Sequence, residues 1–339
     1  YSGGATCPSL LLEPSRTNNI QYSESITSSW WLLSNVTTLD NQGISPEGLN
    51  NAGKITLTST GGCVIYRTSV VIGNGVLSFF AKPGTLSDGR VRVSVDGVGA
   101  AYWNIDGTLS SVSGGTAENG ESYGNGWFRF SYNVPSGSVA NYGVQGGVIG
   151  ESMLVYGIQA EPNASYATSY IPTYGVSQTR ANDECVGAGD SSTFNSSEGV
   201  LFWEGSILSN TTIPGAIALI GAGSSNRVQF YNLGTSFVTL VQVGGSIVFQ
   251  TSTGGTIDIT TNHKYAVKWA LNDFALWVDG VEIATDTSGA TFPNNTLNQL
   301  RFSDFGTNYL YANTKQAITF NEALSDLDLA ILTGATTYN

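Results

Sequence analysis

The 339-residue sequence is poor in charge and in histidine. Only 11% of its residues are charged, and 13 Lys and Arg stand against 25 Asp and Glu, which gives a formal net charge of −12. A nucleic-acid binder needs a clustered basic surface that neutralises phosphates, so this balance argues against nucleic acids and anionic lipid surfaces as partners. His263 is the single histidine, so it is the one candidate for catalysis that depends on an imidazole.

Cysteines are also few, and their number is odd. Cys7, Cys63 and Cys185 have no C-x-x-C spacing, so the sequence contains neither a zinc knuckle nor a dense disulfide framework. Cys7 and Cys63 could pair in an oxidising compartment, and the sequence leaves this open. No stretch approaches the ~20 apolar residues that a bilayer span needs. Because the chain opens at Tyr1 rather than Met, we expect a processed product or a fragment of something longer.

Period-2 alternation of apolar and polar residues is abundant, and it is typical of half-buried antiparallel strands. It is clear in RVRVSVD at 90–96, in WFRFSYNV at 127–134 and again at 263–271. Asp-Gly pairs separate several such strings, and this dipeptide tolerates the positive φ angles of a tight hairpin turn. The string FALWVDGVEIA at 274–284 therefore predicts a strand, a two-residue turn and a second strand.

The spacing of these short strands predicts an all-β protein made of two consecutive antiparallel β-sandwich (jelly-roll) domains. A polar run containing Pro and Gly interrupts the alternation, so we expect a first domain at 1–175, a linker at 176–190 and a second domain at 191–339. One short C-terminal helix is predicted, because Ser325 is a good N-cap with Asp328 three residues on.

The sequence offers little for an enzyme. His263 has the strand parity of the core-facing Tyr265 and Trp269, which predicts a strand-end histidine satisfied by a backbone group. No E-x-D-x-x-E strand supplies the facing carboxylates of concanavalin-A-like glycanases. The remaining acidic clusters border the linker and the terminal helix, where carboxylates ordinarily cap or stabilise a helix. We therefore predict that the protein is not an enzyme.

Several strings in the first half carry a family resemblance. They are SLLLEPSRTN at 9–18 followed by Trp30-Trp31, LSFFAKPG at 77–84, NGWFRFS at 125–131 and GIQAEPNASYATSYIPT at 157–173. Together they resemble a jelly-roll module of bacteriophage tail and appendage proteins, of the carbohydrate-binding family 4/9 type. The second half, through 263–283 and 316–333, is similar to a laminin-G or concanavalin-A-like domain.

This pairing of modules resembles phage fibre and receptor-binding proteins. It implies a non-enzymatic protein of the virion surface or extracellular space that binds glycans or a host-surface polysaccharide. It also implies contacts with other virion proteins and a homo-oligomer such as a trimer. Two alternatives stay open: a purely structural decoration or fibre subunit whose aromatic residues fill subunit interfaces, and, third, a secreted polysaccharide lyase or hydrolase.

Candidate sugar contacts follow from the chemistry of saccharides, which present flat apolar faces edged by hydroxyls to aromatic rings and polar side chains. In Trp30-Trp31 and Tyr102-Trp103, adjacent residues cannot both face one core, so at least one of each pair must point outward or into a loop. The loop at 303–311 offers a second cluster. The candidates are Trp30, Trp31, Tyr102, Trp103, Asp304, Phe305, Asn308 and Tyr309.

Calcium is the metal that best suits this composition, because it takes carboxylate and carbonyl oxygens rather than imidazoles and thiolates. The jelly-roll resemblance implies a structural Ca²⁺ near Glu13 and Glu161, in the first and last strands of the first module. Salt bridges from these carboxylates to Arg16 or Arg180 are the competing use. No other cofactor is expected.

Overall fold

The computed structural model describes residues 9–185, 187–208, 215–304 and 308–334, and these are mostly β-sheet with one short helix. The chain divides into two compact units. The middle unit comprises Ser15–Ala181, and the split unit combines Tyr1–Pro14 with Asn182–Asn339. The prediction of antiparallel β-sandwiches with a C-terminal helix is confirmed.

The first sheet of the middle unit, sheet I, is antiparallel throughout. Its strands, in order of pairing, are β10 (Leu109–Ser113), β9 (Gly99–Trp103), β8 (Arg90–Val95), β14 (Val139–Gln145), β6 (Gly62–Thr68) and β3 (Leu32–Ser34). Strands β8 and β9 are joined across Asp96-Gly97, and Gly97 has a φ of 74°. This turn aligns Arg92 with Tyr102.

The second sheet of the middle unit, sheet II, packs against sheet I. Its strands, in order of pairing, are β11 (Thr116–Ala117), β13 (Trp127–Val134), β7 (Gly75–Lys82), β15 (Ser152–Glu161), β5 (Ala52–Leu57) and β4 (Val36–Gly43), while β12 (Glu121–Gly124) also pairs with β13. A separate pair joins β2 (Arg16–Asn18) to β16 (Gln178–Arg180).

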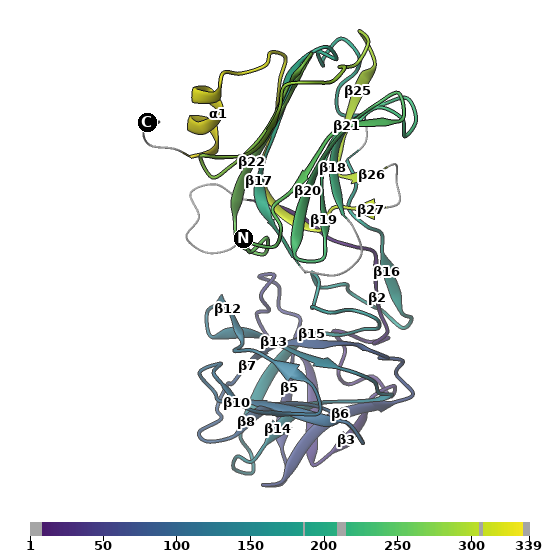
Figure 1. Cartoon of the computed structure of the whole chain (residues 1–339). Helices are drawn as coiled ribbons and strands as arrows, with labels where there is room; N and C mark the ends of the chain where they lie inside the picture. Colours follow the sequence, from purple (N-terminus) through teal and green to yellow (C-terminus); the bar gives the residue numbers. More distant parts are fainter. Residues whose placement is uncertain (1–8, 186, 209–214, 305–307, 335–339) are drawn as a thin grey trace. The chain divides into compact units, whose positions relative to one another are not determined.

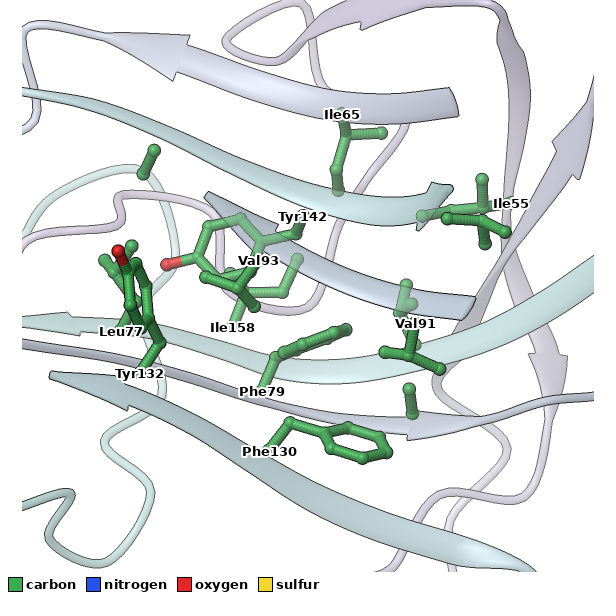
Figure 2. Close-up of a cluster of buried hydrophobic side chains, with 14 of the residues drawn as sticks. Ile55, Ile65, Leu77, Phe79, Val91, Val93, Phe130, Tyr132, Tyr142 and Ile158 are labelled. Carbon is green, nitrogen blue, oxygen red and sulfur yellow. The ribbon is translucent and has the colours of Figure 1, made fainter. Parts of the chain in front are cut away.

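Alternation in these strands builds the core of the middle unit. Every second residue of β7, β8 and β14 points between the sheets and is fully or almost fully buried, and so is every second residue of β13 from Phe130 on. Figure 2 shows Val93 and Tyr142 of sheet I facing Phe79 and Phe130 of sheet II. Burial of these side chains, at about 25 cal/mol per Å² of apolar surface, is the main stabilising term of the sandwich.

The split unit is a second sandwich of two sheets. Sheet III has the order β1 (Leu10–Leu12), β28 (Ala312–Phe320), β17 (Gly199–Ile207), β22 (His263–Ala270), β23 (Asp273–Val278) and β24 (Val281–Asp286). Sheet IV has the order β21 (Ser246–Ser252), β20 (Ser236–Val243), β19 (Arg227–Leu233), β18 (Ala216–Gly221), β27 (Asn308–Tyr309) and β26 (Ser303–Asp304), with β25 (Leu297–Arg301) also on β18.

The predicted hairpin and helix both form in the split unit. Asp279 and Gly280 adopt φ angles of 48° and 84°, the left-handed turn that joins β23 to β24. Helix α1 (Asp326–Thr333) begins after Ser325, whose side chain accepts a hydrogen bond from the backbone N–H of Asp328. The helix covers the outer face of sheet III, where Leu329 packs in a buried cluster with residues of β17, β22 and β23 (Figure 1).

The first strand lies elsewhere than the sequence analysis expected. Residues 10–12 pair with β28 in sheet III of the split unit, not within a jelly roll of residues 1–175. The chain therefore passes from one unit to the other twice, after Pro14 and after Ala181. The second passage lies inside the expected linker at 176–190, and there Gln178–Arg180 forms strand β16.

Candidate functional site

Two of the four paired aromatic candidates are core residues. Trp103 is 0% exposed and donates its indole N–H to the Glu118 carbonyl at 2.7 Å, and Trp31 is 4% exposed and donates to the Tyr22 carbonyl at 3.0 Å. Neither ring has a face for a ligand. Their prediction as sugar contacts is corrected: strand parity directs Trp103 inward, and the hydrogen bond to Tyr22 and packing in the core hold Trp31, which precedes β3.

Trp30 is partly buried, but its ring is enclosed by neighbours. The Arg67 guanidinium lies 4.9 Å from the ring centroid, and Trp31 packs edge-on at 4.8 Å. Arg67 also donates to the Trp30 carbonyl at 2.7 Å, so arginine and indole hold one another in place. These contacts give Trp30 a structural use that competes with ligand binding.

Tyr102 is the candidate that lies on an outer sheet surface. It is partly exposed, while its neighbours Ala101 and Trp103 are buried on the opposite face of β9. In the register of sheet I, Tyr102 stands between Arg92 of β8 and Ser111 of β10. A partly exposed aromatic ring bordered by hydrogen-bonding side chains is the combination that a sugar site requires.

Two arginines accompany this ring. The guanidinium carbon of Arg90 lies 5.0 Å from the Tyr102 ring centroid, and that of Arg92 lies 5.9 Å from it. Arg92 donates through Nη1 to Gln145 Oε1 at 3.3 Å, while its Nε is buried without a hydrogen-bond partner. Neither arginine forms an ion pair with a described residue.

The residues around Tyr102 on this side of sheet I are polar or small. Strand β14 lies beside β8 and places Gln145 opposite Arg90, Gly143 opposite Arg92 and Asn141 opposite Ser94. Tyr66 of β6 follows beside Asn141. We name this surface the Tyr102 face; it consists of Tyr66, Arg90, Arg92, Tyr102, Asn141 and Gln145.

The sequence analysis did not identify the arginines of the Tyr102 face as site residues. Alternation at 90–96 predicts Arg90 and Arg92 on one face of a strand, but alternation does not say which strand lies next to them. Asp96-Gly97 indicates a turn between the two strands, but the register also depends on the length of the loop. The loop has three residues, 96–98, so Val95 pairs with Gly99 and Arg92 lies opposite Tyr102, whereas a two-residue turn would place Ala101 opposite Arg92.

In the second predicted cluster, at 303–311, the candidates Asp304, Asn308 and Tyr309 belong to two short strands of sheet IV. Asp304 pairs with Arg227 at 3.0 Å, and the short strands β26 and β27 place Asp304 opposite Asn308. Tyr309 pairs through its backbone with Ser303 and lies beside β18. Asn308 and Tyr309 are partly exposed, and Phe305 lies outside the described residues.

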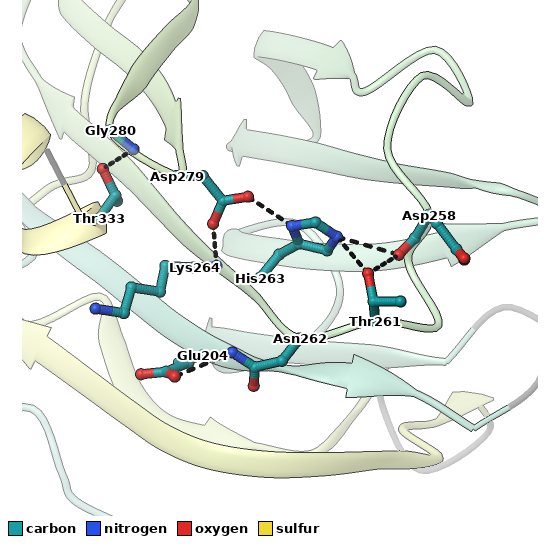
Figure 3. Close-up of polar contacts among 9 residues, drawn as sticks. All are labelled: Glu204, Asp258, Thr261, Asn262, His263, Lys264, Asp279, Gly280 and Thr333. Carbon is teal, nitrogen blue, oxygen red and sulfur yellow. Dashed lines mark hydrogen bonds and ion pairs between the residues drawn. The ribbon is translucent and has the colours of Figure 1, made fainter.

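His263 is fixed by polar contacts at the start of β22 (Figure 3). Its Nδ1 lies 2.5 Å from Asp279 Oδ2, and its Nε2 lies 3.1 Å from the Asp258 carbonyl and 2.9 Å from Thr261 Oγ1. Thr261 Oγ1 also donates to the Asp258 carbonyl at 2.9 Å, so its proton points away from the imidazole. The predicted strand-end position and backbone contact of His263 are confirmed, whereas its shortest contact, to the Asp279 carboxylate, was not predicted.

The two carboxylates proposed for calcium belong to different units of the chain. Glu13 follows β1 in the split unit, whereas Glu161 ends β15 in the middle unit. Glu161 is fully buried, and its oxygens accept hydrogen bonds from the Thr168 N–H and hydroxyl. Its lone pairs are therefore directed at protein donors. Among the described residues, no group of three His, Cys, Asp or Glu side chains gathers where it could hold a metal.

A polar cluster that the sequence did not predict surrounds Glu24. Three phenol hydroxyls donate to one carboxylate oxygen, Glu24 Oε1: Tyr170 and Tyr174 at 3.1 Å and Tyr156 at 3.4 Å. Burial raises the pKa of Tyr156 and of Tyr170 well above the usual value, so both stay protonated and can donate. The cluster ties 170–174 to the segment that contains Glu24.

Two further sequence expectations concern cysteine and membranes. Cys63 is a buried free thiol whose Sγ donates to the Ser59 carbonyl, and burial raises its pKa. Cys7, the other member of the pairing that the sequence left open, lies outside the described residues. Within the described part of the chain, no helix has both the length and the apolar character needed to cross a bilayer.

In comparisons with known proteins, this chain is similar in fold to several solved structures. No protein-family profile and no curated protein sequence matches the chain. The carbohydrate-binding module (CBM40) of the Ruminococcus gnavus IT-sialidase, solved with α2,3-sialyllactose, is 15% identical, with 43% of this chain and 84% of that chain covered and a TM-score of 0.34.

Two further solved structures resemble the chain at a similar level. A SAP-like pentraxin from Limulus polyphemus is 12% identical, with 41% of this chain and 70% of that chain covered and a TM-score of 0.33. Sheep galectin-11 is 13% identical, with 37% and 90% covered and a TM-score of 0.27. At these identities and TM-scores the likeness concerns the β-sandwich alone.

Proposed function

We propose that this chain is a non-enzymatic glycan-binding protein and that the Tyr102 face of the middle unit is its binding surface. One observation carries the proposal: Tyr102 is partly exposed on an outer sheet surface among side chains that can hydrogen-bond a sugar rim. The other members of the predicted aromatic pairs are buried or enclosed. Trp30 and Tyr309 are also partly exposed, and we favour Tyr102 because two arginines and a glutamine accompany it on one outer sheet surface.

The chemistry of the Tyr102 face suits a saccharide. Pyranose rings expose apolar C–H groups that pack on an aromatic ring, and their hydroxyls need donors and acceptors around it. Arg92 and Gln145 already form one hydrogen bond across β8 and β14, so their side chains are partly ordered before a ligand arrives. Prior ordering lowers the entropy lost on binding.

The proposal of a binding protein rather than an enzyme rests on the positions of the acids and of His263. In the split unit, His263 bonds to Asp279, Thr261 and a backbone carbonyl, so its ring is held in a strand-end network. The strands of sheet I contain no Asp or Glu, so the Tyr102 face lacks the carboxylate pair of glycoside hydrolysis.

The setting is part of the same proposal. A virion-surface or extracellular location, contacts with other virion proteins and a homo-oligomer such as a trimer rest on the resemblance to phage appendage modules. A structural subunit without sugar binding is the rival account. It predicts that no glycan binds the full chain and that Tyr102 contributes nothing to recognition.

A glycan array probed with the full chain tests the proposal. We expect a defined set of glycans to bind and Tyr102→Ala to weaken that binding about tenfold or more, which corresponds to ~1.4 kcal/mol. Tyr102→Phe keeps the ring and should retain most of the affinity. The matched control is Tyr123→Ala, which removes a 45%-exposed tyrosine from β12 of sheet II. Absence of glycan binding would overturn the function, and unchanged binding by Tyr102→Ala would overturn the site.

A further inference from the structure

The charge of the protein is unevenly divided between its two units. The middle unit carries 8 basic and 10 acidic side chains, a net charge of −2, whereas the split unit carries 5 basic and 15 acidic side chains, a net charge of −10. The acidic excess that argues against polyanionic partners therefore belongs almost entirely to the split unit. Long-range repulsion of an anion near the middle unit is correspondingly weak.

Within the middle unit, the sheet that bears Tyr102 has charge of one sign. The strands of sheet I contain the arginines Arg67, Arg90 and Arg92 and no Asp or Glu. Sheet II differs, because Asp40, Glu121 and Glu161 lie in its strands together with basic residues. The Asp96 carboxylate, in the loop between β8 and β9, accepts a hydrogen bond from Asn141 of the Tyr102 face at 2.9 Å, so the cationic part of the face is the part around Arg90 and Arg92.

Arg90 and Arg92 are partly buried and form no ion pair with a residue that the structure describes. Both lie beside the Tyr102 ring, and Arg92 has one protein acceptor, Gln145 Oε1, and an Nε atom without any. A guanidinium withdrawn from water is usually paired, since burying an unpaired charge is costly. Its planar fork matches the two oxygens of a carboxylate or sulfate, and a hydrogen bond to an ion is about twice as strong as a neutral one.

We propose that the Tyr102 face selects acidic saccharides, with Arg90 and Arg92 binding a carboxylate or sulfate of the sugar beside Tyr102. This inference rests on the proposed glycan-binding function and adds a ligand class to it. Tyr102 supplies the ring for the C–H face, and the two guanidiniums supply the charge-assisted contacts. Neutral glycans gain only the first of these interactions.

The test titrates the full chain with polymers that differ in one property. Polygalacturonate is compared with its carboxyl-reduced neutral form, and dextran sulfate is compared with dextran. We expect each acidic polymer to bind at least about tenfold more tightly than its neutral partner, as one strong charged contact implies. The two arms show whether carboxylate, sulfate or both are accepted. Raising the NaCl concentration should weaken only the acidic polymers.

Variants of the full chain test whether Arg92 causes the preference for acidic polymers. Arg92→Gln should reduce binding of the acidic polymers about tenfold and that of the neutral polymers much less, because glutamine keeps hydrogen-bonding groups for sugar hydroxyls and loses the charge. Lys54→Gln is the control, since it removes the same charge from β5 of sheet II. Polyaspartate, an anion without sugar, should bind weakly.

Each remaining outcome has a defined meaning. Equal binding of acidic and neutral polymers that Arg92→Gln does not alter would overturn the charge selectivity and leave glycan binding standing. Polyaspartate binding as tightly as polygalacturonate would also overturn acidic-saccharide recognition, because the face would then accept any polyanion. Failure of every polymer together with a blank glycan array would remove the proposed function itself.

Discussion

The side chain of Arg92 occupies the space that Gly62 leaves empty. A Cβ built on Gly62 would lie 2.8 Å from Arg92 Nη1, closer than such atoms normally approach. The two residues come from β8 and β6, with β14 between them. The missing side chain at position 62 therefore lets the guanidinium extend across the sheet to Gln145.

Gly62→Ala should separate binding from stability. The backbone of Gly62 does not need a positive φ, and the crowded atom is the end of a flexible side chain, so the folded state should lose about 0.5 kcal/mol or less. Displacement of the Arg92 guanidinium should weaken acidic-glycan binding several-fold. Calorimetric titration and thermal unfolding measure the two effects. Gly61→Ala is the matched control, because its nearest contact is Ser59 Oγ at 3.7 Å.

Alanine substitutions of the adjacent residues Tyr102 and Trp103 on β9 should differ in their effect on stability. Trp103→Ala removes a fully buried indole from the core and should lower the free energy of unfolding of the middle unit by about 3–5 kcal/mol. Tyr102→Ala removes a partly exposed ring and should lower it by about 1 kcal/mol or less. Chemical denaturation measures both, and comparable losses would contradict the assignment of opposite faces.

Strand β9 illustrates what can and cannot be predicted from the sequence. Alternation predicted the sandwich correctly, because a period of two places every second residue between the sheets whichever strands are neighbours. The steric argument that Tyr102 and Trp103 cannot share a core also held, since one is buried and the other partly exposed. It could not say which ring is inside, because both are large and apolar enough for burial.

The partner of a short strand is the harder problem. Residues 10–12 form three backbone pairs with β28, about three hundred positions away, and no local pattern in so short a segment identifies that partner. Glu13 was misplaced for the same reason. Its expected proximity to Glu161 depended on assigning the preceding strand to the first module, whereas the strand belongs to the split unit.

The strand β1 makes the split unit depend on the N-terminal end of the chain. Leu12 is 3% exposed in the core of that unit, whereas Leu11, its neighbour on the same strand, is 40% exposed. Leu12→Ala should cost about 2–5 kcal/mol through the lost apolar contacts and the cavity left behind. Leu11→Ala should cost about 0.5 kcal/mol or less.

Hydrogen exchange of the full chain can locate this effect. Amides of β28 and β17 should lose protection in Leu12→Ala, because β1 covers the edge of β28 and Leu12 packs in their core. Amides of β7 and β13, in the middle unit, should exchange as in the unaltered protein. Loss of protection in both units, or in the middle unit alone, would contradict the assignment of β1.

The buried carboxyl of Glu161 should give the middle unit a pH-dependent stability. Burial raises the pKa of Glu161, while hydrogen bonds from Thr168 and Gln159 and the charge of Arg129 only partly oppose the rise. A folded-state pKa above the unfolded value means that the folded state holds its proton more tightly. This contribution is therefore complete below the unfolded pKa, about 4.3, and is lost as pH rises through the folded pKa.

Glu161→Gln should flatten that part of the pH profile, because it removes the titrating group and keeps an oxygen that can accept from Thr168. Denaturant unfolding of the full chain between pH 4 and pH 8 measures the slope. Glu151→Gln is the control of opposite sign. Hydrogen bonds from Ser87, foremost, and from Val148 lower the pKa of the partly exposed Glu151, so its contribution to stability is lost as pH falls. A Glu161→Gln profile as steep as that of the unaltered protein would mean that Glu161 is ionised in the fold and stabilised by its donors.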